Sequence, residues 1–167
     1  MKKSKLQCEH NIEPVYNAGS RVLILGSFPS VKSREAEFFY SHPKNRFWKV
    51  LPALFEEEEP VTTEDKKTFL LSHGIALWDV IASCEIAGSS DSSIQNVELN
   101  DISRILKAAD IKAIYANGTK AATLYEKYIR PVTGREIMKL PSTSPANASW
   151  SLERLIQEWK CVRLHLD

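Results

Sequence analysis

The chain has 167 residues, of which 43% are hydrophobic and 26% are charged, and its formal net charge is +1. This length predicts one domain whose core is large enough to need no disulfide or metal to hold it together. The composition excludes intrinsic disorder, collagen and a coiled coil for the chain as a whole. We therefore expect residues 1–167 to form a single domain, with residues 1–19 as a peripheral N-terminal segment.

The charges are unevenly distributed along the chain. The net charge is +5 over residues 1–50, −8 over residues 51–100 and +4 over residues 101–167. Basic segments of this kind attract phosphates locally, although an ordinary solvated surface would give the same pattern. Apolar stretches are too short for a membrane helix, and the first residues lack the apolar core of a signal peptide. We expect a cytoplasmic monomer with no membrane contact.

Four short apolar runs predict the strands of one sheet. Each run is continuous, which is typical of a strand buried on both faces of a parallel sheet. In chain order they are residues 21–26, 75–80, 111–116 and 136–140. Because helical patterns separate these runs, the sequence predicts an α/β fold: a three-layer α/β/α sandwich around a central, mainly parallel, four-stranded sheet.

The helices are predicted from apolar residues at helical spacing and from capping residues. Phe47, Leu51 and Leu54, for example, would lie on one face of a helix. Thr62 stands where a hydroxyl would cap the start of another. The predicted helices span residues 47–54, 64–72, 102–106, 119–128 and 151–159.

Three polar loops are expected at the carboxyl ends of the strands, where such sheets bind their ligands. They are residues 27–44, Asn117-Gly118 and residues 141–149. The last loop gathers hydroxyl groups in front of a helix, which suits an anion, although loops of this composition are often only turns. The carboxyl edge of the sheet is therefore the predicted place for chemistry.

The segment after the first strand combines aromatic and basic side chains. Phe39 and Tyr40 stand close in sequence to Lys44, Arg46 and Lys49. Aromatic rings stack on bases, and cationic side chains hold phosphates. This pattern favours contact with a nucleic acid. Core aromatics surrounded by solvated charges remain the alternative interpretation.

Several enzyme classes lack support because their motifs are absent from the sequence. They are phosphate-loop hydrolases, dinucleotide-binding enzymes, zincins and α/β-hydrolases with the usual serine motif. A serine hydrolase that uses Ser27, His42 and Asp79 stays open, since these residues lie near predicted strand ends or loops.

Five segments in a fixed order resemble the uracil-DNA glycosylase superfamily, and in particular its hypoxanthine (deoxyinosine) DNA glycosylase branch. They are Leu25–Ser30, His42–Trp48, Leu77–Ile81, Asn117-Gly118 and Leu140–Asn147. The resemblance spans about residues 20–160. It implies a parallel sheet between helices, no metal and no cofactor. The implied partner is DNA, double-stranded or single-stranded, that contains a deaminated base.

Two departures from the family pattern bear on the reaction. Phe28 stands where mismatch-specific uracil glycosylases carry a water-activating asparagine, and Asp79 stands where uracil-specific relatives carry a base-reading asparagine. The resemblance to the hypoxanthine branch points instead to Asn45 as the catalytic amide. It implies a preference for hypoxanthine over uracil, with a uracil or mismatch-specific glycosylase as the alternative.

The resemblance also implies the remaining site residues. The flipped base would stack on Tyr40, in a pocket formed by Gly26, Ser27, Phe28, Pro29 and Asn117. The DNA phosphates would be held by Ser30, Ser142, Thr143, Ser144 and Asn147. The implied enzyme is a monofunctional base-excision repair glycosylase that hydrolyses the N-glycosidic bond of deoxyinosine. A catalytically silent DNA-binding module with the same fold is the alternative function from another class. Among the single residues, Tyr40 could instead be a core aromatic, Asn117 a turn residue and Asn45 a helix cap.

Overall fold

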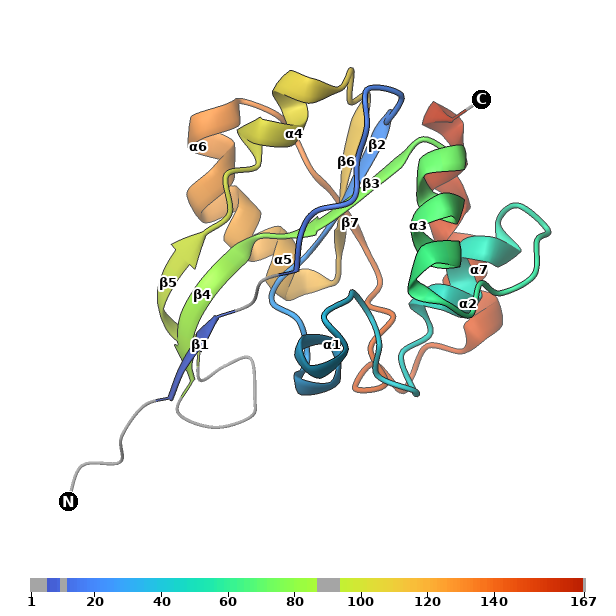
Figure 1. Cartoon of the computed structure of the whole chain (residues 1–167), viewed down its shortest axis with the longest axis horizontal. Coiled ribbons are helices and arrows are strands. Elements are labelled where there is room, and N and C mark those ends of the chain that lie inside the picture. The colour runs from blue at the N-terminus through green and yellow to red at the C-terminus, as the bar shows by residue number, and fades with distance from the viewer. Residues whose placement is uncertain (1–5, 10–11, 87–93, 167) are drawn as a thin grey trace.

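A computed structural model describes residues 6–9, 12–86 and 94–166. At its centre is the predicted four-stranded parallel sheet, with strand order β3-β2-β6-β7 (Figure 1). The strands are β2 (Val22–Gly26), β3 (Ile75–Asp79), β6 (Ala113–Asn117) and β7 (Met138–Leu140). Every residue of β2 and β3 is buried, which explains why continuous apolar runs identified these strands.

Helices cover both faces of the sheet and confirm the three-layer arrangement (Figure 1). One layer contains α2 (Phe47–Ala53), α3 (Thr63–Ser72) and α7 (Leu152–Trp159), which continues as the 3-10 helix η3 (Lys160–His165). The other contains α4 (Ser103–Ala108), α5 (Thr119–Leu124), the π-helix η2 (Tyr125–Ile129) and α6 (Arg130–Thr133). The predicted cap of α3 is present, because the Thr62 hydroxyl accepts a hydrogen bond from Asp65 N at 3.0 Å.

Two features of the fold were not predicted from the sequence. A short helix, α1 (Val31–Ala36), lies within the segment predicted as a loop. A second, antiparallel sheet has the order β1-β4-β5, with β1 (Leu6–Glu9), β4 (Ile81–Ile86) and β5 (Ile94–Leu99). In β4 and β5 polar residues interrupt the apolar ones, so neither strand is a continuous apolar run.

Part of the N-terminal segment that was expected to be peripheral attaches to the central sheet. Val15 and Leu77 exchange two backbone hydrogen bonds of 3.0 and 2.9 Å, which adds an antiparallel bridge to β3. Ile12 and Val15 are each only 5% exposed. Among the described residues, no helix is long and apolar enough to cross a membrane.

Candidate active site

The carboxyl ends of the parallel strands bring the predicted loops together. Gly26 at the end of β2 pairs in register with Asp79 at the end of β3. Asn117 at the end of β6 pairs with Leu140 at the end of β7. The helix α1 and the loop before α7 lie at this same end of the molecule, at the bottom of Figure 1. The first and last predicted loops therefore meet, as the sheet topology requires.

The side-chain amide of Asn45 has a fixed orientation. Its Oδ1 accepts hydrogen bonds from the backbone N–H of Phe47 at 2.9 Å and from the hydroxyl of Thr143 at 2.8 Å. A backbone N–H can donate only to the oxygen of the amide, so Nδ2 must point the other way. Within the described part of the chain, Nδ2 has no acceptor. Asn45 thus uses its oxygen to begin α2 and leaves two N–H donors for a ligand.

Thr143 links Asn45 to Asn117. The Thr143 hydroxyl donates to Asn45 Oδ1 and accepts from Asn117 Nδ2 at 3.0 Å, while Thr143 N donates to Asn117 Oδ1 at 3.0 Å. The residue is fully buried. Although Thr143 was expected to contact a DNA phosphate, its hydroxyl has these internal partners instead. Its role here is to position the two amides.

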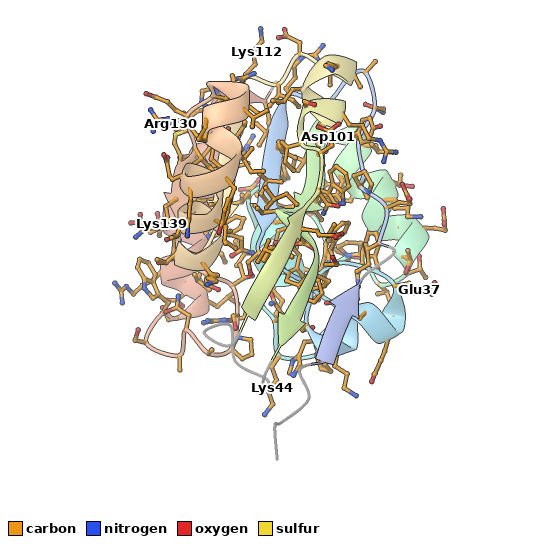
Figure 2. The ribbon with its side chains drawn as sticks, turned by 90° about the vertical axis from the view of Figure 1, so that its left-hand side faces the viewer. Glu37, Lys44, Asp101, Lys112, Arg130 and Lys139 are labelled. Atoms are coloured by element: carbon orange, nitrogen blue, oxygen red, sulfur yellow. The ribbon has the colours of Figure 1, made fainter. Side chains whose placement is uncertain are left out.

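Arg46 and Lys44, both expected to meet phosphates, have different environments. The guanidinium of Arg46 donates to the carbonyl oxygens of Ser144 at 3.1 Å, Asn147 at 3.0 Å and Trp150. Arg46 therefore holds the loop before α7 in place. Lys44 is exposed and extends from the bottom of the molecule, at the opposite end from Lys112 (Figure 2).

The side chains predicted to bind phosphate make hydrogen bonds within their own loops. Ser142 Oγ accepts from Ser144 N at 3.1 Å, and the Ser142 carbonyl accepts from Asn147 Nδ2 at 3.0 Å. Ser144 Oγ accepts from Ala146 N at 3.1 Å. Ser30 caps α1 by accepting from Ser33 N at 3.2 Å and is itself exposed. These bonds set the shape of the surface around the site.

The backbone of the first loop is tied to the turn that follows β3. The carbonyl of Gly26 accepts from Val80 N at 2.8 Å, and that of Ser27 accepts from Ile81 N at 3.0 Å. Phe28 is half-buried, with the guanidinium carbon of Arg34 5.3 Å from its ring centroid. Pro29, the last of the expected pocket residues in this stretch, is buried. The loop is therefore held close to the strand ends.

Tyr40 adopts an unusual backbone conformation at the site. Its φ is +53°, in the left-handed region that bulky residues rarely occupy. Its ring stacks on Phe47 with centroids 4.1 Å apart and planes 21° apart. Its hydroxyl is buried, makes no hydrogen bond of normal geometry with a described residue, and lies near the Asn117 side chain. Strain of this kind persists only where the surroundings enforce it, and it is concentrated at functional sites.

The side chains of Asp79 and Tyr40 both lie close to Gly26. A Cβ at Gly26 would lie 2.4 Å from Asp79 Oδ1 and 2.9 Å from the Tyr40 hydroxyl oxygen, so a larger residue here would force these side chains to shift. Asp79 is 3% exposed, and its Oδ2 has no partner in the described structure. Burial raises the pKa of Asp79 to about 7. Burial and then the Asp79 charge raise the pKa of Tyr40, against a smaller opposing effect of Asn117.

From the sequence, Asp79 was expected to contribute to a preference for hypoxanthine, because it replaces the base-reading asparagine of uracil-specific relatives, and it was a member of the alternative serine triad. Its burial and its raised pKa were not predicted. The available signal was an aspartate directly after the apolar run of β3, where burial of its side chain was to be expected.

The serine hydrolase alternative has no geometric support. In the described part of the chain, no hydrogen bond joins Ser27, His42 and Asp79. The Nδ1 of His42 instead accepts from Lys44 N at 3.1 Å. The described residues also contain no group of three or more His, Cys, Asp and Glu side chains that could hold a metal ion.

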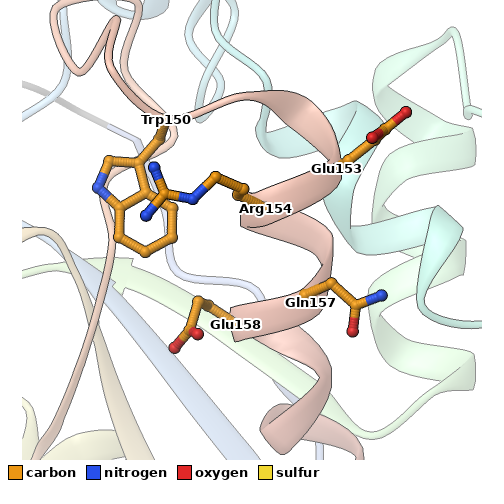
Figure 3. Close-up of a pocket in the computed structure, with 5 residues that line it drawn as sticks. All are labelled: Trp150, Glu153, Arg154, Gln157 and Glu158. Atoms are coloured by element: carbon orange, nitrogen blue, oxygen red, sulfur yellow. The ribbon is translucent and has the colours of Figure 1, made fainter.

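A separate hollow lies on the surface of α7. Its volume is about 310 Å³, and it is lined by Trp150, Glu153, Arg154, Gln157 and Glu158 (Figure 3). The Arg154 guanidinium carbon is 4.2 Å from the Trp150 ring centroid. None of the predicted site residues lines this hollow, so it is not the candidate active site.

Comparisons with known proteins point to one family. A model of the uracil DNA glycosylase superfamily matches residues 13–163. A Methanosarcina acetivorans protein named hypoxanthine DNA glycosylase is 36% identical over 153 residues, 90% of this chain and 95% of its own. A Methanosarcina barkeri protein of the same name is 34% identical over 137 residues, 80% of this chain and 85% of its own. An NMR structure from M. acetivorans, provisionally assigned as a uracil DNA glycosylase, matches with a TM-score of 0.78 and 30% identity, over 95% of this chain and 99% of that one.

Proposed function

Because the chain belongs to the uracil DNA glycosylase superfamily, we propose that it is a DNA glycosylase that hydrolyses the N-glycosidic bond of deoxyinosine and releases hypoxanthine. The observation that carries this proposal is the pair of unused N–H donors of Asn45 beside the carboxyl edge of the sheet. The names of the two Methanosarcina relatives support hypoxanthine as the base.

The proposed reaction begins when the base leaves the DNA stack. Flipping is needed because the bond is inaccessible inside a duplex, and it costs less for a poorly paired base such as hypoxanthine. Cleavage then places positive charge on the sugar and negative charge on the departing base. The N–H groups of Asn45 are suited to stabilise that negative charge or to hold the attacking water. The amide cannot act as a strong base, which suits a reaction driven by the leaving group.

The other site residues complete this proposal. Tyr40 stacks on the flipped base, the backbone of Gly26 to Pro29 lines the pocket, and Asn117 supplies a second polar contact. Lys44, Ser30 and the loop before α7 hold the flanking phosphates. The protein acts as a monomer in the cytoplasm, on double-stranded or single-stranded DNA. It needs no metal or cofactor for this chemistry.

Oligonucleotides that carry hypoxanthine, uracil or xanthine test the activity. After incubation, alkaline treatment cuts the strand wherever a base has been released. We expect cutting at hypoxanthine and much less at uracil. Comparable excision of uracil would overturn the preference and support the uracil or mismatch-specific alternative. DNA binding without release of any base would identify a catalytically silent binding module.

The salt dependence of DNA binding tests the role of Lys44. Each phosphate contact that is lost reduces the slope of log K against log salt by about 1. We expect Lys44→Ala to lower this slope by about that amount in duplex binding titrations. Lys112→Ala is the matched control, because this exposed lysine lies at the opposite end of the molecule (Figure 2). Equal slopes for Lys44→Ala and the wild type would remove Lys44 from the interface.

A further inference from the structure

We propose that Asp79 reads the flipped base as a neutral carboxylic acid, whose carbonyl accepts from N1–H and whose O–H donates to O6 of hypoxanthine. This inference rests on the proposed function and extends it, since it assigns the hydrogen-bonding partner of the reacting base. The carboxyl group lies at the carboxyl end of β3, in register with Gly26 of the pocket loop.

The surroundings of Asp79 favour the neutral acid. The side chain is 3% exposed, and Oδ2 is buried without a partner among the described residues. An ionised carboxylate in such a place is costly unless a cation or several donors compensate for it. Burial is the cause of its raised pKa of about 7, and no cationic side chain of the described chain shares in that shift.

Among the described residues, one other titratable group interacts with Asp79. This group is the Tyr40 hydroxyl, from the segment between α1 and α2. Strand β2 contributes only Gly26, and β6 contributes the neutral amide of Asn117 near Tyr40. Asn100, which follows β5, donates its side-chain amide to the Asp79 backbone carbonyl at 2.8 Å and not to the carboxyl. The carboxyl therefore has no counter-ion in the described structure.

Two unpaired polar groups side by side indicate a ligand site. Buried polar groups normally have hydrogen-bond partners, and exceptions at a strand end mark places where a ligand completes the bonding. Here Asp79 Oδ2 and the Tyr40 hydroxyl both lack a hydrogen bond of normal geometry in the described part of the chain, close to Gly26. A bound base would supply the partner that the Asp79 carboxyl lacks.

The protonation state decides whether the contact helps the reaction. A neutral acid offers one donor and one acceptor, which match the O6 and N1–H of the hypoxanthine lactam. A carboxylate offers acceptors only and faces O6, where negative charge grows as the glycosidic bond breaks. A donor at that position stabilises the transition state, whereas a carboxylate destabilises it. Excision should therefore weaken as Asp79 ionises.

The test is the pH profile of single-turnover hypoxanthine release by the wild type and Asp79→Asn. The asparagine amide keeps one donor and one acceptor at every pH, so this variant serves as the reference for all other titrations. At protein concentrations well below saturation, where the rate reports the free protein, we expect the ratio of wild-type to variant rate to fall about 10-fold per pH unit above the pKa of Asp79. Asp110→Asn is the control, because Asp110 is exposed and paired with Lys112 at 2.7 Å. Its profile should follow that of the wild type.

A second measurement needs no variant. Binding of a duplex with an uncleavable 2′-fluoro deoxyinosine, followed by calorimetry in buffers of different ionisation enthalpy, counts the protons taken up. At about pH 8, where Asp79 is mostly ionised in the free protein, we expect uptake of up to about one proton. No uptake, or a constant rate ratio between wild type and Asp79→Asn, would overturn the inference while leaving the activity intact. Absence of hypoxanthine release by the wild type at every pH would overturn the proposed function as well.

Discussion

Replacing Asn45 with alanine is expected to lower the single-turnover rate of hypoxanthine release by about 10²- to 10³-fold, the scale for loss of one preorganised polar group. The reason is that the variant loses both N–H donors of an amide whose orientation is fixed by Phe47 N and the Thr143 hydroxyl. Duplex affinity should change little, because Asn45 is uncharged and affinity comes mostly from phosphate contacts. Excision rate, duplex affinity and melting temperature should be measured on the same preparation.

Asn45→Asp separates the two uses of the side chain. An aspartate keeps the oxygen that accepts from Phe47 N at the start of α2, but it has a second oxygen in place of the N–H donors. The rate of Asn45→Asp should therefore fall as far as that of Asn45→Ala. The alanine variant also loses the hydrogen bond from Phe47 N at the start of α2, a loss that resembles removal of a helix cap and costs about 1 kcal/mol of stability, whereas the aspartate retains this bond. A rate near wild type for Asn45→Ala would show that Asn45 is not catalytic and would make Asn117 the next candidate. A rate near wild type for Asn45→Asp alone would show that the residue handles water through its oxygen and not the leaving base through its N–H groups.

The central sheet was predictable because its strands are buried on both faces. Val22–Leu25 in β2 has no exposed surface, and such burial leaves a continuous apolar run in the sequence. The antiparallel strands β4 and β5 mix polar and apolar residues and gave no such run. The helix α1 is only six residues long, too short for a clear apolar period.

The candidate site was predictable in part. Asn45 and Asn117 were identified through the family resemblance, but the role of Thr143 in linking them was not. The Thr143 hydroxyl meets Asn45 across 98 residues of sequence, and only the folded chain shows that this hydroxyl is buried. The ionisation of Asp79 likewise depends on burial and on the lack of a cation nearby, two properties that no local pattern reports.

The same carboxyl should make folding stability depend on pH. Burial raises the folded-state pKa of Asp79 from 3.8 to about 7. Between these values the folded state holds a proton that the unfolded state has released, so stability falls as pH rises, by about 1.4 kcal/mol per pH unit. The stability of the wild type relative to Asp79→Asn should therefore drop by about 4 kcal/mol from pH 4 to pH 7 and then level off. Urea denaturation of both proteins over this range measures the difference.

Asp110→Asn should show the opposite pH dependence of folding stability. Its hydrogen bond and charge interaction with Lys112 lower the pKa of Asp110, so the stability that this carboxylate provides is present at neutral pH and is lost as the solution becomes acidic. The wild type should thus lose stability relative to Asp79→Asn as the pH rises. It should lose stability relative to Asp110→Asn as the pH falls. A flat difference between the wild type and Asp79→Asn would mean that the Asp79 carboxyl has an ordinary pKa in the folded protein. In that event it would be ionised at neutral pH and could not donate to O6 of a bound base.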